Sequence, residues 1–236
     1  GPVVPGRYHD LAAVTPPGHV AVIARTLFES ADTSFSAALE VMQAPDIDAI
    51  LAAGERFVAP AVNLVVADRQ RIALEVTGHV PRRHPDHPTR GRMPAPGWNH
   101  ATRWQGVHPH ATNPREIDPD CGFVANTNNR TVTRDFPEHV SFDWGDNQRI
   151  GRIRELLSAP HMFGPDDMAA QIHDLHSPGA ARLVPLLLAH AGPAEGPAGE
   201  AQALLEALDF RMDAARPEPA LYLAWARALR DGLIAG

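Results

Sequence analysis

The sequence predicts an α+β protein in which strands and loops come first and helices follow. Short apolar runs broken by Pro and Gly fill residues 1–145, which is the pattern of strands and turns. From residue 146 onward apolar residues recur at helical spacing, as in NQRIGRIRELLSA. The chain has 236 residues, of which 44% are hydrophobic and 21% charged, so a folded core is expected.

Four apolar runs of the first region are expected to be strands. They are GHVAVIART, NLVVAD, RIALEVTG and GFVAN, at residues 18–26, 63–68, 71–78 and 122–126. The second and third are separated only by Arg69 and Gln70, and so they predict a hairpin. Asp68 suits its turn, because an Asp side chain can accept hydrogen bonds from the backbone two residues on.

Helices are expected both between these strands and after them. SFSAALEVMQA has Ser34 as a cap, and DIDAILAAGERF has Pro45 and Asp46 at its start. Five helical segments follow residue 146, with GPAEGPAG at residues 192–199 as a flexible joint. We assign residues 1–145 to a strand- and loop-rich segment and residues 146–236 to a helical region of the same domain.

Composition excludes several classes of function. The net charge of −7 with no long basic run argues against nucleic acid as a partner. No apolar run approaches the ~18 residues of a membrane span. The single cysteine, Cys121, rules out an internal disulfide framework and a Cys-rich zinc site. The chain opens with GPVVPGRYHD and no Met, so we expect an internal piece of a longer product.

Residues 81–119 form a long Pro-rich region that holds most of the histidines. A loop of this length in a compact domain is usually functional or disordered, and Trp98 and Trp104 are expected to anchor it to a core. A metal site needs three or four ligands held at fixed geometry, whereas Pro beside these histidines does not aim them. We therefore predict a polar loop without a metal for this set: His79, His84, His87, His100, His108 and His110.

The segment CGFVANTNNR ends an apolar run in three amides, Asn126, Asn128 and Asn129. An Asn N–H at the end of a rigid strand is a fixed donor that can stabilise the oxyanion of an acyl-transfer intermediate. Asn is also common in turns, and on this segment alone a turn is favoured. The neighbouring motifs change that balance.

A series of short motifs runs in order through the first 157 residues. They are GPVV at the start, PAVNLVVAD at 60–68, GHVPRR at 78–83, PAPG at 94–97, WQG at 104–106, NP at 113–114, GFVANTNN at 122–129, DFP at 135–137, WG at 144–145 and RIGRI at 149–153. No single motif is specific. Their collinear order resembles the β-chain of the penicillin acylase family, which includes penicillin G acylases, cephalosporin acylases and acyl-homoserine-lactone acylases.

The resemblance implies an N-terminal-nucleophile hydrolase. In such enzymes a precursor cuts itself, and the new N-terminal Ser of the β-chain attacks an amide with its own α-amino group as general base. The implied fold is a four-layer αββα arrangement, of which this chain would be a part with a helical C-terminal region. The family's oxyanion-hole Asn corresponds to Asn128, and its active-site Arg corresponds to Arg149. The spacing between these two residues favours Asn128 over Asn126.

The chain departs from the family pattern at its N-terminus and in its acidic residues, and these departures determine what we expect of its activity and metal content. The chain begins at GPVV without an N-terminal Ser, so the nucleophile is expected outside it and the isolated chain is expected to be inactive. The implied partners are the α-chain and the remainder of the β-chain of the same precursor, with a small-molecule amide as substrate. Many members bind calcium, but the segment after DFP has Glu138 as its only carboxylate, so no cofactor or metal is expected.

Two interpretations remain open at this stage. In the first, the chain contributes Asn128 and Arg149 to an amide hydrolase acting on a β-lactam, an acyl-homoserine lactone or a related amide. In the second, it is a non-catalytic scaffold or ligand-binding fragment of that fold. The family resemblance implies a periplasmic or extracellular location.

Overall fold

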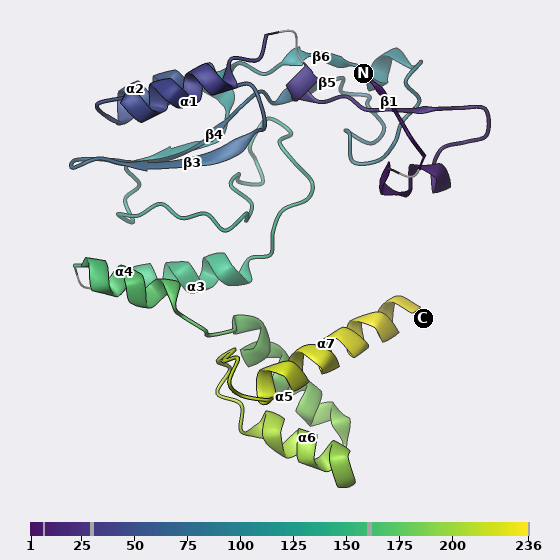
Figure 1. The fold of residues 1–236 in the computed structure, drawn as a ribbon, viewed down its shortest axis with the longest axis vertical. Helices are drawn as coiled ribbons and strands as arrows, with labels where there is room; N and C mark the ends of the chain where they lie inside the picture. Colours follow the sequence, from purple (N-terminus) through teal and green to yellow (C-terminus); the bar gives the residue numbers. More distant parts are fainter. Residues whose placement is uncertain (7, 29–30, 160–161, 236) are drawn as a thin grey trace. The chain divides into compact units, whose positions relative to one another are not determined.

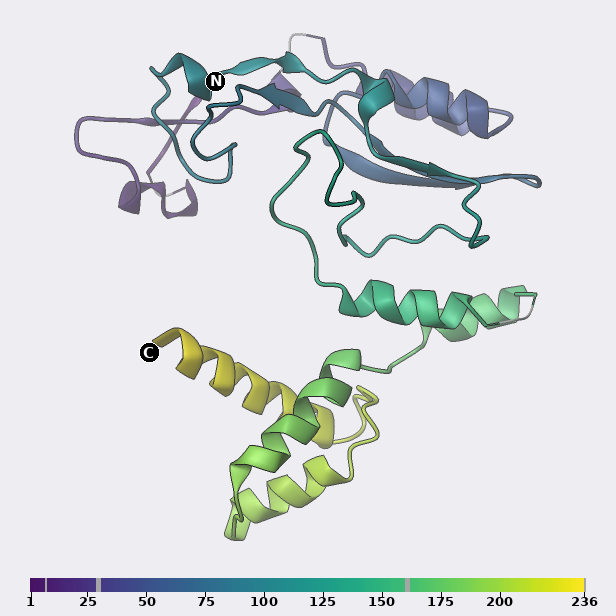
Figure 2. The same ribbon diagram turned by 180° about the vertical axis from the view of Figure 1, so that it is seen from behind.

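The computed structural model describes residues 1–6, 8–28, 31–159 and 162–235. Its contacts divide the chain into two compact units, Gly1–Gly145 and Asp146–Gly236 (Figures 1 and 2). The first unit combines strands with helices and the second is helical, which confirms the α+β class. The expectation that both units belong to one domain stays a prediction.

The first unit is built around a three-stranded antiparallel sheet in the order β3-β4-β7. These strands are Val62–Ala67, Ile72–Thr77 and Arg115–Ile117. The central strand β4 is buried on both faces, because helices cover one face and the chain after β7 runs along the other (Figure 1). The expected hairpin is confirmed, with Ala67 opposite Ile72.

Helices α1 (Ser34–Gln43) and α2 (Ile47–Gly54) cover one face of this sheet (Figure 1). Asp46 precedes α2 as its N-cap, and its Oδ1 accepts a hydrogen bond from the Ala49 N–H at 2.9 Å. This bond satisfies one of the four N–H groups that a helix start leaves unpaired. Both expected helices are therefore confirmed.

The expectation that Ser34 caps α1 is wrong. The N-cap position is Thr33, and Ser34 is already the first residue of the helix. Its buried Oγ instead accepts hydrogen bonds from the N–H groups of Val58 and Ala59, both at 2.9 Å. Those two backbone N–H groups are buried, and a buried N–H without an acceptor is costly. The Ser34 hydroxyl therefore serves as their acceptor instead of capping the helix.

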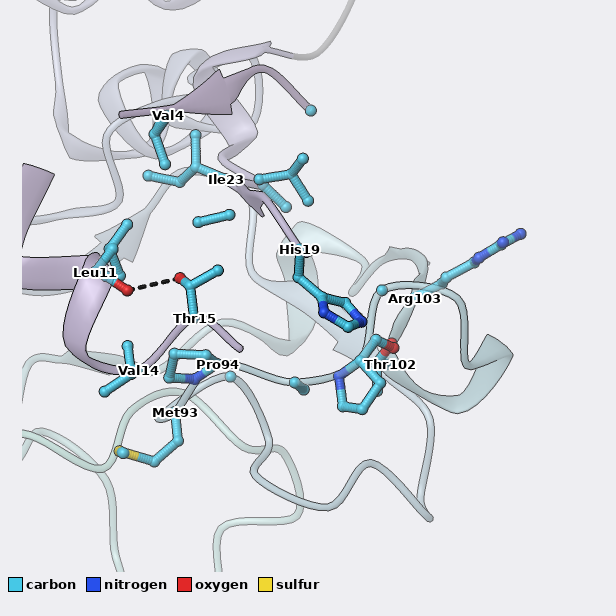
Figure 3. A pocket seen from close by; sticks show the side chains of 18 of the residues that line it. Val4, Leu11, Val14, Thr15, His19, Ile23, Met93, Pro94, Thr102 and Arg103 are labelled. Atoms are coloured by element: carbon cyan, nitrogen blue, oxygen red, sulfur yellow. Dashed lines mark hydrogen bonds between the residues drawn. The ribbon is translucent and has the colours of Figure 1, made fainter. Parts of the chain in front are cut away.

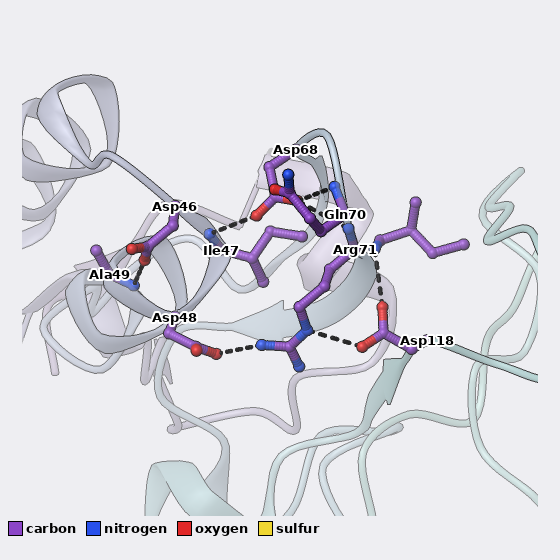
Figure 4. Close-up of polar contacts among 9 residues, drawn as sticks. Asp46, Ile47, Asp48, Ala49, Asp68, Gln70, Arg71 and Asp118 are labelled. Atoms are coloured by element: carbon purple, nitrogen blue, oxygen red, sulfur yellow. Dashed lines mark hydrogen bonds and ion pairs between the residues drawn. The ribbon is translucent and has the colours of Figure 1, made fainter.

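The hairpin turn between β3 and β4 is held by the Asp68 carboxylate, as expected (Figure 4). Asp68 Oδ1 accepts from the N–H groups of Gln70 and Arg71 at 2.8 and 2.7 Å. These backbone bonds lower the pKa of Asp68. The Arg71 guanidinium in turn pairs with Asp48 at 2.7 Å and Asp118 at 2.8 Å, which ties the turn to α2 and to the chain after β7.

Two short ladders complete the first unit. Strand β1 (Val3–Val4) pairs with β2 (Ala21–Val22), and β5 (Pro81–Arg83) pairs with β6 (Trp104–Val107). Short 3₁₀ helices lie along the same unit, at η1 Tyr8–Ala13, η2 Thr26–Phe28, η3 His100–Thr102 and η4 His110–Thr112. The strand expected over residues 18–26 is therefore confined to the two residues of β2.

Two other expectations for the first unit are wrong. Residues 122–126 form no strand, because their backbone makes no ladder pairing with any described strand, and the contact with β3 runs through the side chains of Asn63 and Asn126. Trp98 is 70% exposed and does not anchor the Pro-rich region, whereas Trp104 lies half-buried in β6.

All five helical segments expected after residue 146 are confirmed in the second unit. They are α3 Gln148–Leu157, α4 Pro165–Ile172, α5 Pro178–Ala191, α6 Gly196–Glu206 and α7 Glu218–Ala235. Since α6 begins inside GPAEGPAG, only residues 192–195 of that stretch connect two helices. The core of α5, α6 and α7 includes Val184, Leu205 and Tyr222, with Trp225 packed against it.

None of the helices in the described ranges is both long and apolar enough to cross a bilayer.

Candidate active site

The amide loop, which we define as residues 126–129, lies against the sheet face opposite α1 and α2. On that sheet Leu64 stands opposite Glu75, whose carboxylate oxygen approaches Gly54 of α2. Side chains alternate between the faces of a strand, so Asn63 points away from the helices. Its Nδ2 donates a hydrogen bond of 3.1 Å to Asn126 Oδ1, which fixes the loop to β3.

Asn126 anchors the loop rather than facing outward. Its Oδ1 accepts from Asn63 Nδ2 and also from the backbone N–H of Asn128, at 3.0 Å. Its Nδ2 is buried, with no hydrogen-bond partner among the described residues. One carbonyl oxygen thus connects the sheet, the start of the loop and the residue two positions later.

Asn129 closes the loop from the other end. Its side chain is almost fully buried, at 4% exposure. Its Oδ1 accepts from the Thr127 N–H at 3.0 Å, and its Nδ2 donates to the carbonyl of Arg130 at 3.0 Å. The amide is therefore committed to the backbone of its own neighbours, as is common for Asn in turns.

Asn128 differs from both neighbours, because it is exposed and its backbone is left-handed, with φ of 64°. Asn tolerates this region better than other residues with a Cβ. Its N–H donates to Asn126 Oδ1, and its carbonyl accepts from the Gly145 N–H at 2.6 Å. The peptide units on both sides of Asn128 are thus held, and the direction of its Cα–Cβ bond is fixed.

Gly145 is a residue that the sequence reasoning used only as part of a family motif. A Cβ at this position would lie 2.8 Å from the Asn128 carbonyl oxygen and 3.1 Å from its carbon, which is closer than real Cβ contacts. Only glycine allows the 2.6 Å approach of the two backbones. The Trp144-Gly145 motif carried this signal, but the contact across 17 positions could not be predicted from sequence alone.

The amide loop can present a hydrogen-bond donor to an external group from a preorganised backbone. An amide N–H aimed at a developing oxyanion stabilises a tetrahedral intermediate by roughly 3–4 kcal/mol when it needs no rearrangement. Asn129 Nδ2 is bonded to the Arg130 carbonyl and Asn126 Nδ2 is buried, whereas the Asn128 side chain is exposed, so Asn128 is the best placed of the three to meet an external group. This geometry distinguishes the candidates that the sequence named together.

Arg149 is exposed at the second position of α3. It belongs to the second unit, whereas Asn128 belongs to the first. The expectation that the two side chains act together stays a prediction.

The histidines of residues 79–110 are dispersed among separate contacts. His87 Nδ1 accepts from the N–H groups of Thr89 and Arg90 at 3.3 and 3.0 Å. The His84 and His100 rings lie 5.1 Å apart, and His108 Nδ1 lies 3.3 Å from a carboxylate oxygen of Glu138.

Across the part of the chain that the structure describes, no three His, Cys, Asp or Glu side chains gather as a metal site would require. Glu138, the carboxylate considered for calcium, is paired with His108.

Comparison with known proteins places the chain among acylases. The family described as penicillin amidase matches residues 1–236. Penicillin acylase 2 proenzyme of a Pseudomonas species is 34% identical over 231 residues, which is 97% of this chain and 28% of that protein. Acyl-homoserine lactone acylase QuiP of Pseudomonas syringae pv. tomato is 30% identical over 149 residues, 63% of this chain and 18% of that protein.

A solved structure shares the fold. The thermostable penicillin G acylase from Alcaligenes faecalis aligns with a TM-score of 0.57 and 20% identity, covering 76% of this chain and 32% of that one. At this identity the likeness concerns the fold alone. The chain thus spans less than a third of the length of each of these three proteins.

Proposed function

We propose a function that starts from one fact: this chain belongs to the penicillin amidase family. In this proposal it supplies the oxyanion-stabilising side chain of an acylase-type amide hydrolase. Asn128 is the donor, and Arg149 holds Asn128 and the amino group of the nucleophile in place. The Ser nucleophile lies on a segment outside residues 1–236. The substrate is a small-molecule amide such as a β-lactam or an acyl-homoserine lactone, which are the substrates named for the relatives.

The observation that supports this proposal most is the division of roles in the amide loop. Asn126 and Asn129 use their side chains to fix the loop, while Asn128 is exposed and its backbone is clamped by Asn126 and Gly145. A donor held in this way loses little entropy when the negative charge develops, which is the condition under which oxyanion stabilisation is strongest.

The chemistry required of Asn128 is limited. Attack of the Ser oxygen on the amide carbon breaks the carbonyl π bond and leaves the charge on oxygen. The Asn128 Nδ2–H donates to that oxygen more strongly in the intermediate than in the neutral amide, so it accelerates the step. The isolated chain lacks the nucleophile and is expected to be inactive.

The test compares two substitutions in the full-length gene product. Asn128→Ala is expected to lower kcat by ~10²–10³-fold with an unchanged thermal midpoint. Asn129→Ala is the matched control, since it removes a buried amide of the same loop and is expected to cost about 1–3 kcal/mol of stability. An unchanged kcat in Asn128→Ala would exclude Asn128 from the reaction.

The alternative, a non-catalytic fragment that keeps the fold, is addressed by a separate measurement. Intact mass and N-terminal sequencing of the full-length product show whether a chain beginning with Ser is generated. A processed chain with an N-terminal Ser supports the hydrolase. A product that is never cut supports the scaffold, since the nucleophile would then not form.

A further inference from the structure

The first unit contains a cavity of about 980 Å³ between its N-terminal segment and the loop of residues 83–104. Its wall is apolar. Figure 3 shows Val4, Leu11, Val14 and Ile23 around one part of the hollow, with Met93 and Pro94 across from them. Trp98 and Trp104 also line it. This volume lies at the upper end of ordinary small-molecule pockets, which are mostly apolar with a few polar groups that fix the ligand's orientation.

One of those polar groups is the guanidinium of Arg83, at the end of β5. Its Nε is buried and has no hydrogen-bond partner, and none of the described carboxylates pairs with it. Burial lowers the pKa of Arg83, as expected for a cation removed from water without a counter-ion. The backbone of Gly91 packs closely against this guanidinium, since a Cβ there would lie 2.8 Å from Nε. Arg83 as a whole is half-buried, and its buried Nε lacks a partner among the described residues, so a ligand that supplied a negative charge beside it would be favoured.

The surroundings of Arg83 are also positive. None of the described lining residues is acidic, although the chain carries a net charge of −7. Burial first and Arg83 second lower the pKa of His87, and burial, Arg83 and Arg90 lower that of His139. The contribution of Arg83 to both shifts reflects the positive charge that its guanidinium carries into this part of the unit. The local field attracts a single negative charge.

Two of the other lining arginines, Arg92 and Arg103, are less available. Arg92 pairs with Asp143 at 3.0 Å and lies over the ring of Phe142. The Arg103 side chain points away from the hollow (Figure 3). Arg83 is therefore the arginine with an unsatisfied buried nitrogen beside the apolar wall.

We propose that this pocket binds a small-molecule carboxylate with an apolar body. The carboxylate accepts hydrogen bonds from the Arg83 guanidinium, a geometry that can be bidentate. The apolar body packs against the valine, leucine and tryptophan side chains of the wall. A monoanion suits the site because the Nε of Arg83 is a buried donor without a partner among the described residues.

This site is separate from the amide loop, since neither Asn126, Asn128 nor Asn129 lines the cavity. Amide hydrolysis releases a carboxylic acid, so a ligand of this class accords with the proposed function. Binding here needs no catalysis, however. A failure to bind the carboxylate would therefore not contradict the assignment of Asn128. Likewise, an inactive full-length protein would not contradict the assignment of the pocket.

The experiment titrates the 236-residue chain with octanoate and with octanamide, which has the same apolar tail and no charge. Tryptophan fluorescence reports occupancy, because Trp98 and Trp104 line the pocket, and calorimetry gives the affinity. We expect saturable octanoate binding and at least ~10-fold weaker octanamide binding, since charge-assisted bonds are about twice as strong as neutral ones. Equal binding of the two probes, or no saturable octanoate binding, overturns the proposal without any variant.

Two variants then locate the charge. Arg83→Gln is expected to weaken octanoate binding by ~10–100-fold while circular dichroism stays unchanged. Arg103→Gln is the matched control and is expected to bind octanoate like the wild type. If Arg83→Gln folds and keeps its affinity, the carboxylate does not bind there.

A final comparison uses the full-length gene product. Retained octanoate binding supports a ligand pocket. Loss of binding in the full-length protein, with binding by the 236-residue chain, shows that another segment fills the cavity and places its own carboxylate on Arg83. That result overturns the small-molecule assignment.

Discussion

The Asp68 turn and the amide loop lie at opposite ends of β3 and are both short polar turns. In the Asp68 turn, the carboxylate accepts from the backbone of Gln70 and Arg71, and the neighbouring ions pair with each other (Figure 4). In the amide loop, Asn126 and Asn129 hold the backbone and Asn128 is exposed between them. The difference separates a turn that only closes a hairpin from one that presents a side chain.

The comparison also shows the cost of presenting a side chain. In the Asp68 turn, the two short bonds from Asp68 Oδ1 to the backbone lie within four residues of sequence. The amide loop needs Asn63 from β3 and Gly145 from 17 positions later to hold one residue in a left-handed conformation. Such strain persists only when the surroundings determine it from several sides, and it concentrates at functional sites.

Among changes that leave Asn128 in place, the largest expected effect comes from Gly145→Ala in the full-length protein. The added Cβ would lie 2.8 Å from the Asn128 carbonyl, so the loop must move. A displacement of about 1 Å can lower kcat by ~10²-fold, and we expect a loss of this order in steady-state kinetics. The affinity for substrate should change little when Gly145→Ala is added to a variant that lacks the nucleophile and so binds substrate without cleaving it. A normal kcat would show that the clamp on Asn128 has no role in the reaction.

A smaller effect is expected from Asn126→Ala, which removes the acceptor shared by Asn63 and the Asn128 N–H. The Gly145 contact remains, so the loop is loosened rather than displaced. We expect kcat to fall by ~10-fold, which corresponds to about one hydrogen bond. The matched control is Asn63→Ala, which removes only the link to β3 and should have the weaker effect. The reverse order would indicate that the sheet contact, rather than the Asn128 N–H, positions the loop.

Asp68→Ala should lower stability and leave catalysis intact. It removes two backbone hydrogen bonds from the hairpin turn, far from the exposed Asn128. The thermal midpoint is expected to fall by a few degrees, with kcat unchanged once the assay is run below that midpoint. A loss of kcat in folded Asp68→Ala would remove the distinction between the two turns.

A third polar group, Glu75, offers a contrast in pH dependence. It is fully buried on β4, 2.8 Å from Arg115 Nη2 and 3.7 Å from His110 Nε2, and neither of its oxygens accepts a hydrogen bond from the described residues. Burial raises the pKa of Glu75, opposed by Arg115 and aided by Glu55. Folding thus shifts the pKa of Glu75 upward, whereas it shifts the pKa of Asp68 downward.

The sign of the effect follows from that shift. A carboxyl whose folded pKa is raised stabilises the fold below its usual pKa of 4.5, and this contribution is lost as pH rises through the folded pKa. The free energy of unfolding of the wild type should therefore fall, relative to Glu75→Gln, as pH rises above 4.5. Urea unfolding at several pH values measures this difference. A constant difference would mean that Glu75 titrates normally.

His110 is expected to behave in the opposite sense. Burial first, then Arg115, lowers its pKa. Its stabilising contribution is present above 6.5 and is lost as pH falls through the folded pKa. The His110→Gln variant should therefore lose less stability than the wild type when pH falls below 6.5. The stability difference from the wild type should therefore change with pH in opposite directions for Glu75→Gln and His110→Gln. A loss of stability shared by all variants at low pH would not have this pattern.

The sequence predicted the features that depend on near neighbours. The hairpin, the Asp68 turn, the cap at Asp46 and the helices of the second unit all follow from patterns within a few residues. The strand expected over residues 122–126 was wrong because a strand requires a pairing partner, and an apolar run does not supply one. Ser34 was misassigned for a similar reason, since its hydroxyl bonds to residues 24 and 25 positions away.

The candidate site was predicted in part. The motif order singled out Asn128, but the roles of Asn126 and Gly145 depend on contacts that only the folded chain brings together. The unpaired state of Arg83 likewise could not be predicted, because it depends on which carboxylates the fold places nearby. Sequence patterns identify such residues, whereas tertiary contacts decide what each of them does.

The central claim is that Asn128 donates to the oxyanion, and a crystal structure of the full-length protein with an alkyl phosphonate bound to its nucleophile tests it most directly. The tetrahedral phosphonate oxygen occupies the place of the oxyanion. The account predicts Asn128 Nδ2 at about 2.7–3.1 Å from that oxygen, with Asn126 and Asn129 still bonded to the loop. A phosphonate oxygen held by other donors, with Asn128 turned away, would contradict it.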